Sequence, residues 1–184
     1  MDNKINQRTT AIFYTSGLCN LKCRYCGIHK SSVLKQIDEV LEKSFEGDYY
    51  FNRVKKFFPR KDMLTSFETW GGEPFAKMER FHPTLRKLIE YYPYLNSGYS
   101  STNFSYLEWT NKFFGLMDVF GEYSYRNFHY TLQLSVDGPA YINDAGRGEG
   151  VTEKCLMNFN KMVSLLKEGR LPENVNLFIN PFIS

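Results

Sequence analysis

The chain has 184 residues, about the length of one domain, and its 42% hydrophobic and 23% charged residues exclude a wholly disordered protein. Its net charge of +3, from 23 basic and 20 acidic side chains, is too small to indicate a nucleic-acid binder by itself. No apolar run approaches the ~20 residues that a membrane span needs, and the N-terminus lacks the apolar stretch of a signal peptide. We therefore expect a cytoplasmic protein without a membrane or nucleic-acid partner.

The hydrophobic pattern alternates between the period of a strand and the period of a helix. In chain order it predicts a strand over 10–16, a helix over 32–45, a short helix that Asp48 caps and Pro59 ends, a strand over 64–70, a helix over 83–92, a strand over 98–103, a helix over 107–120, a strand over 129–137, a helix over 151–168 and a strand over 175–182. Such alternation predicts a single α/β domain, residues 1–184, in which helices pack on a parallel sheet.

Polar and glycine-rich segments follow the predicted strands. Three cysteines lie after the first strand, 71–74 follows the second, Asn103 ends the third, and Ser135 lies near the end of the fourth, ahead of the glycine-rich segment 144–150. In parallel α/β sheets and barrels, ligands bind at the carboxyl ends of the strands. The sequence therefore predicts one site along one rim of the sheet.

The cysteines are the most informative residues for function. Cys19, Cys23 and Cys26 have the spacing C-x3-C-x2-C, whereas Cys155 lies far away on the apolar stripe of a predicted helix and is expected in the core. Soft thiolates suit zinc and iron–sulfur clusters. Three of them can hold three corners of a cubane cluster and leave one iron open to a ligand. A zinc site with His29 as the fourth ligand is the alternative.

The segment C-N-L-K-C-R-Y-C, residues 19–26, resembles the signature of the radical S-adenosylmethionine (radical SAM) enzymes. W-G-G-E-P at 70–74 resembles the GGEP segment of that family. L-S-V-D-G-P at 134–139 and D-A-G-R-G at 144–148 resemble the fourth strand and the following loop of its peptide- and protein-modifying subgroup, which is SPASM-like and similar to anaerobic sulfatase maturases. These segments occur in the family's order, and the resemblance covers roughly residues 9–182.

The resemblance implies a partial (β/α) TIM-like barrel, here truncated after about the fifth strand. It also implies an enzyme whose 4Fe–4S cluster reductively cleaves S-adenosylmethionine, so that a 5′-deoxyadenosyl radical abstracts hydrogen from a substrate. In this subgroup the substrate is a peptide or protein. A flavodoxin or a ferredoxin is the implied electron donor.

The resemblance also assigns roles to individual residues. Cys19, Cys23 and Cys26 are implied to hold the cluster. Contacts to S-adenosylmethionine are implied for Tyr25, Gly71, Gly72, Glu73, Pro74, Asn103, Ser135 and Arg147. Among these, Glu73 suits the ammonium group, Arg147 the carboxylate and Asn103 the ribose. Asp137 is interpreted as a turn residue before Gly138.

The sequence also departs from the family. It supplies five strands and four main crossovers, fewer than the family's core has, and it has no cysteines for auxiliary clusters beyond that core. We therefore expect a fragment, or a core completed by a missing C-terminal segment or by a partner chain. A catalytically silent subunit that binds the cluster or S-adenosylmethionine is the alternative. The sequence names neither the substrate nor a general base.

Overall fold

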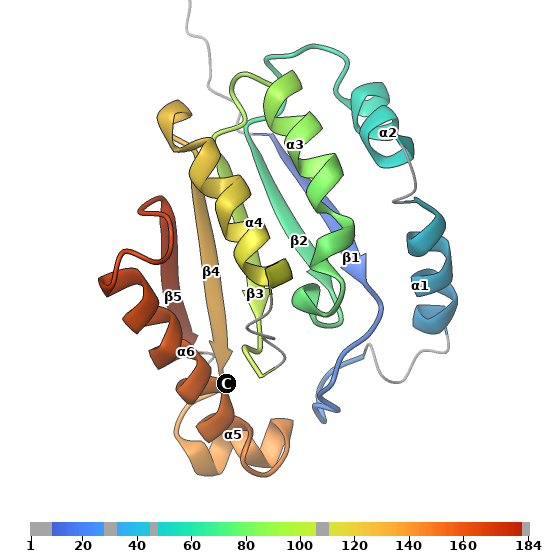
Figure 1. The fold of residues 1–184 in the computed structure, drawn as a ribbon. Coiled ribbons are helices and arrows are strands. Elements are labelled where there is room, and N and C mark those ends of the chain that lie inside the picture. The colour runs from blue at the N-terminus through green and yellow to red at the C-terminus, as the bar shows by residue number, and fades with distance from the viewer. Residues whose placement is uncertain (1–8, 28–32, 45–47, 106–110, 182–184) are drawn as a thin grey trace, which may run out of the picture.

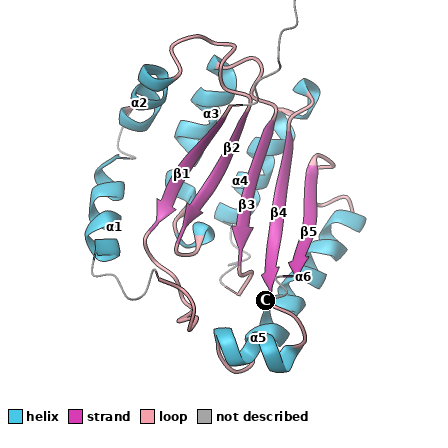
Figure 2. Ribbon diagram, turned by 180° about the vertical axis from the view of Figure 1, so that it is seen from behind, coloured by secondary structure: helices cyan, strands magenta, loops and turns pink. Residues whose placement is uncertain are grey.

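The computed structural model describes residues 9–27, 33–44, 48–105 and 111–181. Five of its strands form one parallel sheet in the order β1-β2-β3-β4-β5, which is also their order in the chain (Figures 1 and 2). The strands are β1 (Thr10–Ser16), β2 (Ser66–Gly71), β3 (Ser97–Thr102), β4 (His129–Val136) and β5 (Val175–Pro181). All five predicted strands are confirmed, with ends that differ by at most two residues.

The helices connect successive strands. They are α1 (Val33–Ser44), α2 (Tyr49–Phe57), α3 (His82–Tyr91), α4 (Asn111–Glu122), α5 (Ala140–Arg147) and α6 (Val151–Lys167), with short 3-10 turns η2 (Pro74–Ala76), η3 (Met78–Arg80) and η4 (Ser124–Arg126). Five of the helices are confirmed predictions. Helix α5 was not predicted, because its sequence A-Y-I-N-D-A-G-R resembles a glycine-containing loop.

The order of the strands distinguishes a barrel wall from a doubly wound sheet. Helices α3, α4 and α6 lie on one face of the sheet, and no helix of the described residues covers the other face (Figures 1 and 2). Crossovers of one hand that always step to the next strand place their helices on one side, as in a (β/α) barrel. A doubly wound sheet reverses its strand order and carries helices on both faces. The predicted partial barrel is therefore confirmed.

The core lies between the sheet and this helix layer. Aromatic rings of the strands stack on rings of the helical side, for example Phe120 on Tyr130 with centroids 3.9 Å apart. Gly98 of β3 has no room for a side chain, because an added Cβ would lie 2.4 Å from Cζ of Phe67. Cys155 of α6 is only 1% exposed, which confirms it as a core residue.

The opposite face of the sheet, which helices leave uncovered, is both aromatic and polar. Tyr14 and Trp70, which pair in the register of β1 and β2, are about half exposed on this face. On β4, Gln133 and Ser135 are partly exposed, while the intervening Leu134 is fully buried against the core. β4 therefore presents a polar face on this side of the sheet, and in a barrel that face points inward.

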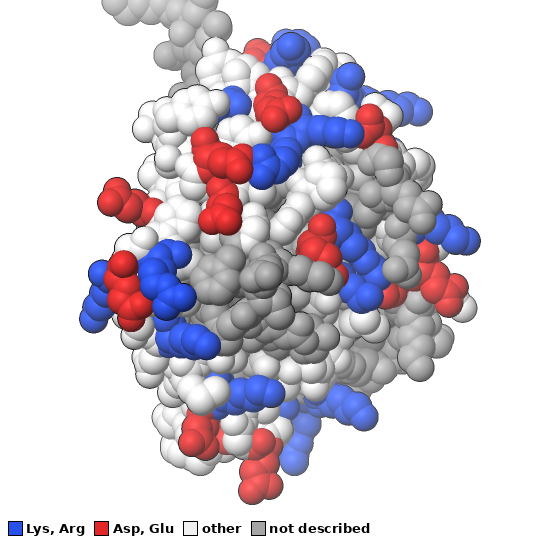
Figure 3. Space-filling view, viewed as in Figure 1, with Lys and Arg blue, Asp and Glu red and all other residues white. Residues whose placement is uncertain are grey.

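The helix-covered side carries charges of both signs, which are interspersed in Figure 3. The guanidinium of Arg86 donates to Glu122 over 2.9 Å, and the ammonium of Lys87 pairs with Asp48. Asp48 is the N-cap residue of α2, as predicted, but its carboxylate makes no cap hydrogen bond and pairs with Lys87 instead. No helix of the described residues is long and apolar enough to cross a membrane.

Candidate functional site

The cysteine loop, defined here as residues 17–27, follows β1 at the carboxyl ends of the strands. Cys19, Cys23 and Cys26 are free thiols, each partly exposed, and the backbone N–H of Cys26 donates to the carbonyl of Cys23 over 3.1 Å. Burial raises the pKa of Cys19 to about 11, and negative charge on Glu73 and on the other two thiols adds to this rise. The three thiols therefore lie close enough to repel one another when ionised.

Three such thiols are suitable ligands for a positively charged metal centre. Thiolates are stabilised when a metal takes their charge, because a coordinating thiol is deprotonated outright. The described residues contain no group of three His, Cys, Asp or Glu side chains already arranged around one point as metal ligands. A cubane cluster takes each thiolate on a different iron atom, so Cys19, Cys23 and Cys26 need not converge on a single point. His29, the alternative zinc ligand, lies outside the described residues.

Two glycines at the end of β2 allow this strand to approach β1 and the cysteine loop closely. Gly71 has φ +143°, and a Cβ added to it would lie 2.0 Å from the carbonyl oxygen of Ser16. At Gly72 a Cβ would lie 2.2 Å from the carbonyl oxygen of Leu18, so neither position has room for a side chain. The N–H of Gly72 donates to Ser16 over 2.9 Å, and the N–H of Glu73 donates to Leu18 over 2.7 Å. Gly71 thus packs against Ser16, the last residue of β1, and Gly72 packs against Leu18 of the cysteine loop.

Glu73 is buried inside this corner, with 1% of its surface exposed. Its carboxylate accepts hydrogen bonds from the hydroxyl of Thr102 (2.6 Å), the backbone N–H of Asn103 (2.9 Å) and the backbone N–H of Phe75 (3.2 Å). Burial raises the pKa of Glu73, and the three donors act against that rise. Pro74, also buried, begins η2, which Glu73 caps. The carboxylate therefore joins the ends of β2 and β3 from within the protein.

Asn103 directs its amide toward the cysteine loop. Its Nδ2 donates to Oδ1 of Asn20 over 3.1 Å and lies 3.9 Å from Sγ of Cys19. Its Oδ1 accepts from the backbone N–H and the hydroxyl of Ser105, over 2.8 Å and 2.6 Å. These bonds fix the buried amide of Asn103 beside the first thiol.

Arg147, at the end of α5, forms a bidentate ion pair with Asp137. Its Nε and Nη2 donate to the two carboxylate oxygens, each over 2.8 Å, and the hydroxyl of Tyr25 donates to the same carboxylate over 2.5 Å. The guanidinium also lies over the ring of Tyr25, 5.7 Å from its centroid. The interpretation of Asp137 as a turn residue missed this role. The one sequence signal for this role is that Asp137 lies two residues after Ser135, at the end of the same predicted strand.

The charges of this ion pair reinforce each other. Burial raises the pKa of Asp137, but hydrogen bonds from Arg147 and Tyr25 outweigh it, so that the pKa lies below its usual value. Burial likewise lowers the pKa of Arg147, and the bonds to Asp137 reverse this and raise it. Both groups are therefore ionised near neutral pH.

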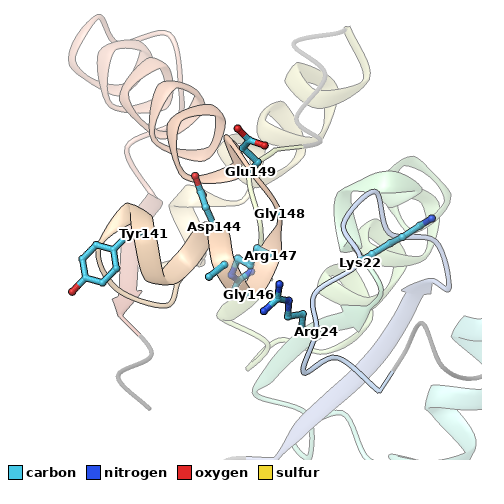
Figure 4. Close-up of a pocket in the computed structure, with 9 residues that line it drawn as sticks. Lys22, Arg24, Tyr141, Asp144, Gly146, Arg147, Gly148 and Glu149 are labelled. Atoms are coloured by element: carbon cyan, nitrogen blue, oxygen red, sulfur yellow. The ribbon is translucent and has the colours of Figure 1, made fainter.

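A cavity of about 580 Å³ opens beside this ion pair (Figure 4). It lies between the cysteine loop, which contributes Lys22 and Arg24, and the segment 144–149 at the end of α5. The backbone N–H of Arg24 donates to the carbonyl of Gly146 over 2.9 Å, and this hydrogen bond joins the two segments. Ser135 lies apart from this cavity on the uncovered face, where its hydroxyl hydrogen-bonds Ser101 over 2.9 Å.

The predicted site residues thus fall into connected groups. Gly71, Gly72, Glu73 and Asn103 contact one another or the first half of the cysteine loop, and Tyr25 and Arg147 meet at its second half. All of them lie at the carboxyl ends of β1 to β4, on the rim that the sequence predicts.

No protein-family model matches the chain, and no curated protein matches it. Among solved structures, the chain is similar to "Native anSMEcpe with bound AdoMet", at 23% sequence identity and a TM-score of 0.53 over 92% of this chain and 43% of that one. It is also similar to native anSMEcpe with bound AdoMet and Cp18Cys peptide, at 24% identity and a TM-score of 0.52 over 91% and 42%. The chain shares its fold with anSMEcpe. It spans less than half the length of the solved chains that it matches.

Proposed function

We propose that this chain is the core of a radical S-adenosylmethionine enzyme. The observation that carries the proposal is the position of three free thiols on one loop, at the carboxyl-end rim of an open, sequentially ordered parallel sheet. The structures with this fold carry bound AdoMet, which is S-adenosylmethionine. The motifs of residues 19–26, 70–74 and 134–148 point to the same chemistry.

In this proposal the chain's residues bind and orient two groups. Cys19, Cys23 and Cys26 hold a 4Fe–4S cluster, and the chemistry that a bound cluster supplies is the electron for reductive cleavage of S-adenosylmethionine. Arg147 receives the carboxylate of S-adenosylmethionine, and Tyr25 lines the space for its adenine. Ser135 offers a hydroxyl from the barrel face.

The structure refines how the other proposed residues act. Gly71 and Gly72 bring the end of β2 against Ser16 and Leu18, so they shape the binding surface through the backbone, and Pro74 begins the η2 turn that follows. Glu73 and Asn103 have their side chains engaged within the protein. Contact of either side chain with the ammonium or the ribose of S-adenosylmethionine requires one of these internal bonds to be exchanged.

For the substrate we propose a peptide or protein, and for the electron donor a flavodoxin or ferredoxin. Support for the first comes from the similar structure that holds AdoMet together with the Cp18Cys peptide. The uncovered face of the sheet, with exposed Tyr14, Trp70 and Phe178, offers aromatic surface for side chains of such a substrate. The chain spans 43% of the similar structure, so a further segment or a partner chain is proposed to complete the substrate site.

The decisive experiment is anaerobic reconstitution with iron and sulfide, followed by iron analysis, optical spectra and, after reduction with dithionite, assay of 5′-deoxyadenosine. We expect the iron of one 4Fe–4S cluster and a brown absorption that dithionite bleaches. Cys23→Ala should lose the cluster. Cys155→Ala is the matched control, because its thiol is buried and donates to the carbonyl of Asn103 over 2.6 Å. Equal iron loss in both variants, or a colourless zinc protein, would contradict the proposal.

A further inference from the structure

Arg147 has a second edge that its ion pair leaves available. A guanidinium carries five N–H donors in a planar fork. The bonds to Asp137 use Nε and Nη2, and Nη1 takes no part in them. An arginine that one carboxylate holds along its Nε–Nη2 edge can still bind a second carboxylate along its Nη1–Nη2 edge.

Asp137 is itself fixed on several sides. Its backbone N–H donates to Oδ1 of Asn143 over 2.9 Å, and the fully buried Asn143 donates in turn to the hydroxyl of Thr152 over 2.7 Å. The hydroxyl of Tyr25 donates to its carboxylate. Asp137 is thus held between the end of β4, α5 and the cysteine loop, and Arg147 takes its own position from its carboxylate.

The packing around Arg147 limits where its side chain can go. Only 10% of the side chain is exposed, and its guanidinium lies over the Tyr25 ring. That ring in turn approaches Gly146 closely, because a Cβ added to Gly146 would lie 3.2 Å from Cε1 of Tyr25. Arg147 nevertheless lines the 580 Å³ cavity (Figure 4), so a ligand there can reach it without opening the fold.

We infer that Asp137 is a positioning residue, which holds Arg147 by one edge and presents the other edge to the carboxylate of S-adenosylmethionine. This inference rests on the proposed function and deepens it. The benefit is pre-organisation, because an arginine already held in its binding geometry loses less conformational freedom when the ligand arrives. Tyr25 helps to position both residues, since its hydroxyl donates to Asp137 and its ring lies under the guanidinium of Arg147.

The test compares two ligands on the cluster-loaded protein by anaerobic calorimetry. One is S-adenosylmethionine, and the other is decarboxylated S-adenosylmethionine, which lacks the carboxylate that Arg147 is proposed to bind. The variants are Asp137→Asn and Tyr25→Phe, and Asp118→Asn is the control because Asp118 is an exposed carboxylate on α4 that does not line the cavity. Iron content and far-ultraviolet circular dichroism are measured on each variant.

We expect Asp137→Asn to weaken binding of S-adenosylmethionine about tenfold to a hundredfold, the value of a charge-assisted hydrogen bond. Binding of the decarboxylated ligand should change by less than about threefold. Tyr25→Phe should act in the same direction and more weakly, which keeps the test decisive if Asp137→Asn folds poorly. Asp118→Asn should leave both affinities unchanged.

Three results would overturn the inference. Equal weakening of both ligands would make Asp137 merely structural, unchanged affinity would remove its role, and tighter binding of S-adenosylmethionine would show that Asp137 competes for Arg147. In each case the wild-type protein still binds S-adenosylmethionine, so the proposed function survives. Failure of the wild-type, cluster-loaded protein to bind S-adenosylmethionine would instead contradict the proposed function together with this inference.

Discussion

Glu73 is expected to stabilise the fold in addition to any contact with a ligand. The substitutions Glu73→Ala and Glu73→Gln test this. In the structure the buried carboxylate accepts from two backbone N–H groups, those of Phe75 and Asn103, and from the hydroxyl of Thr102. The hydroxyl can rotate to another acceptor after the substitution, whereas the two backbone donors are held by η2 and by the end of β3.

The size of the effect follows from these donors. A buried donor without a partner costs about 1–3 kcal/mol, so two of them predict a loss of about 2–6 kcal/mol for Glu73→Ala. Glu73→Gln keeps one acceptor oxygen and places an amide N–H₂ against the other donors, which predicts about 1–3 kcal/mol. A domain of this size has about 5–15 kcal/mol of stability in total, so the larger loss is close to unfolding the chain.

Urea unfolding of the iron-free protein, followed by circular dichroism under reducing conditions, measures these losses without the cluster. Glu68→Gln is the matched control, because Glu68 lies on β2, the strand just before Glu73, and faces the uncovered side, where its carboxylate accepts from the indole of Trp70 over 3.0 Å. We expect the control to remain within about 0.5 kcal/mol of wild type. Equal unfolding free energies for Glu73→Ala and Glu68→Gln would refute the argument. Glu73 would then contribute to ligand binding and not to the stability of the fold.

Two further predictions concern packing and pH. Gly98→Ala should lower the unfolding free energy by about 1–3 kcal/mol, because its Cβ would overlap the ring of Phe67, whereas Gly115→Ala in α4, with nothing within 4 Å of its Cβ, should leave it unchanged or raise it. Because the folded-state pKa of Asp137 is depressed, its contribution to stability is present above the ordinary aspartate pKa of 3.8 and is lost as pH falls through the folded pKa. The difference in urea midpoint between wild type and Asp137→Asn should therefore shrink as pH is lowered through that range, and a constant difference would contradict the assignment.

The strands were predictable because their signal is local. The alternation of apolar and polar residues, as in Leu132, Gln133 and Leu134, can be read from neighbouring positions alone. It corresponds to the alternation of buried and partly exposed side chains in β4. The order of the chemical motifs after successive strands then placed the site on one rim. The predicted location of the site, at the carboxyl ends of β1 to β4, follows from topology alone.

The contacts of the site were not predictable, because they join residues that are far apart in the chain. Tyr25 and Asp137 bind each other across 112 positions of the chain, and Asp48 exchanges its expected cap for Lys87, 39 positions away. Helix α5 was missed because its stability is tertiary. Asn143 accepts from the backbone at the end of β4 and donates to α6, whereas the glycine in the helix weakens its local propensity.

The cysteine loop is held by three strands in turn. The end of β2 binds its beginning, through the N–H of Glu73 on the carbonyl of Leu18. The end of β3 binds its middle, through the amide of Asn103 on Asn20. Beyond β4, the carboxylate of Asp137 accepts from Tyr25, near the loop's end.

The anchors thus follow one another along the loop in the same order as the strands follow one another in the sheet. The spacing C-x3-C-x2-C fixes only how many residues separate the thiols, while successive strand ends fix where Cys19 and Cys26 lie. A doubly wound sheet has a different strand order and would place these anchors apart. The sequential sheet is therefore part of the site, because it is the arrangement that lets β2, β3 and β4 reach one short loop in turn.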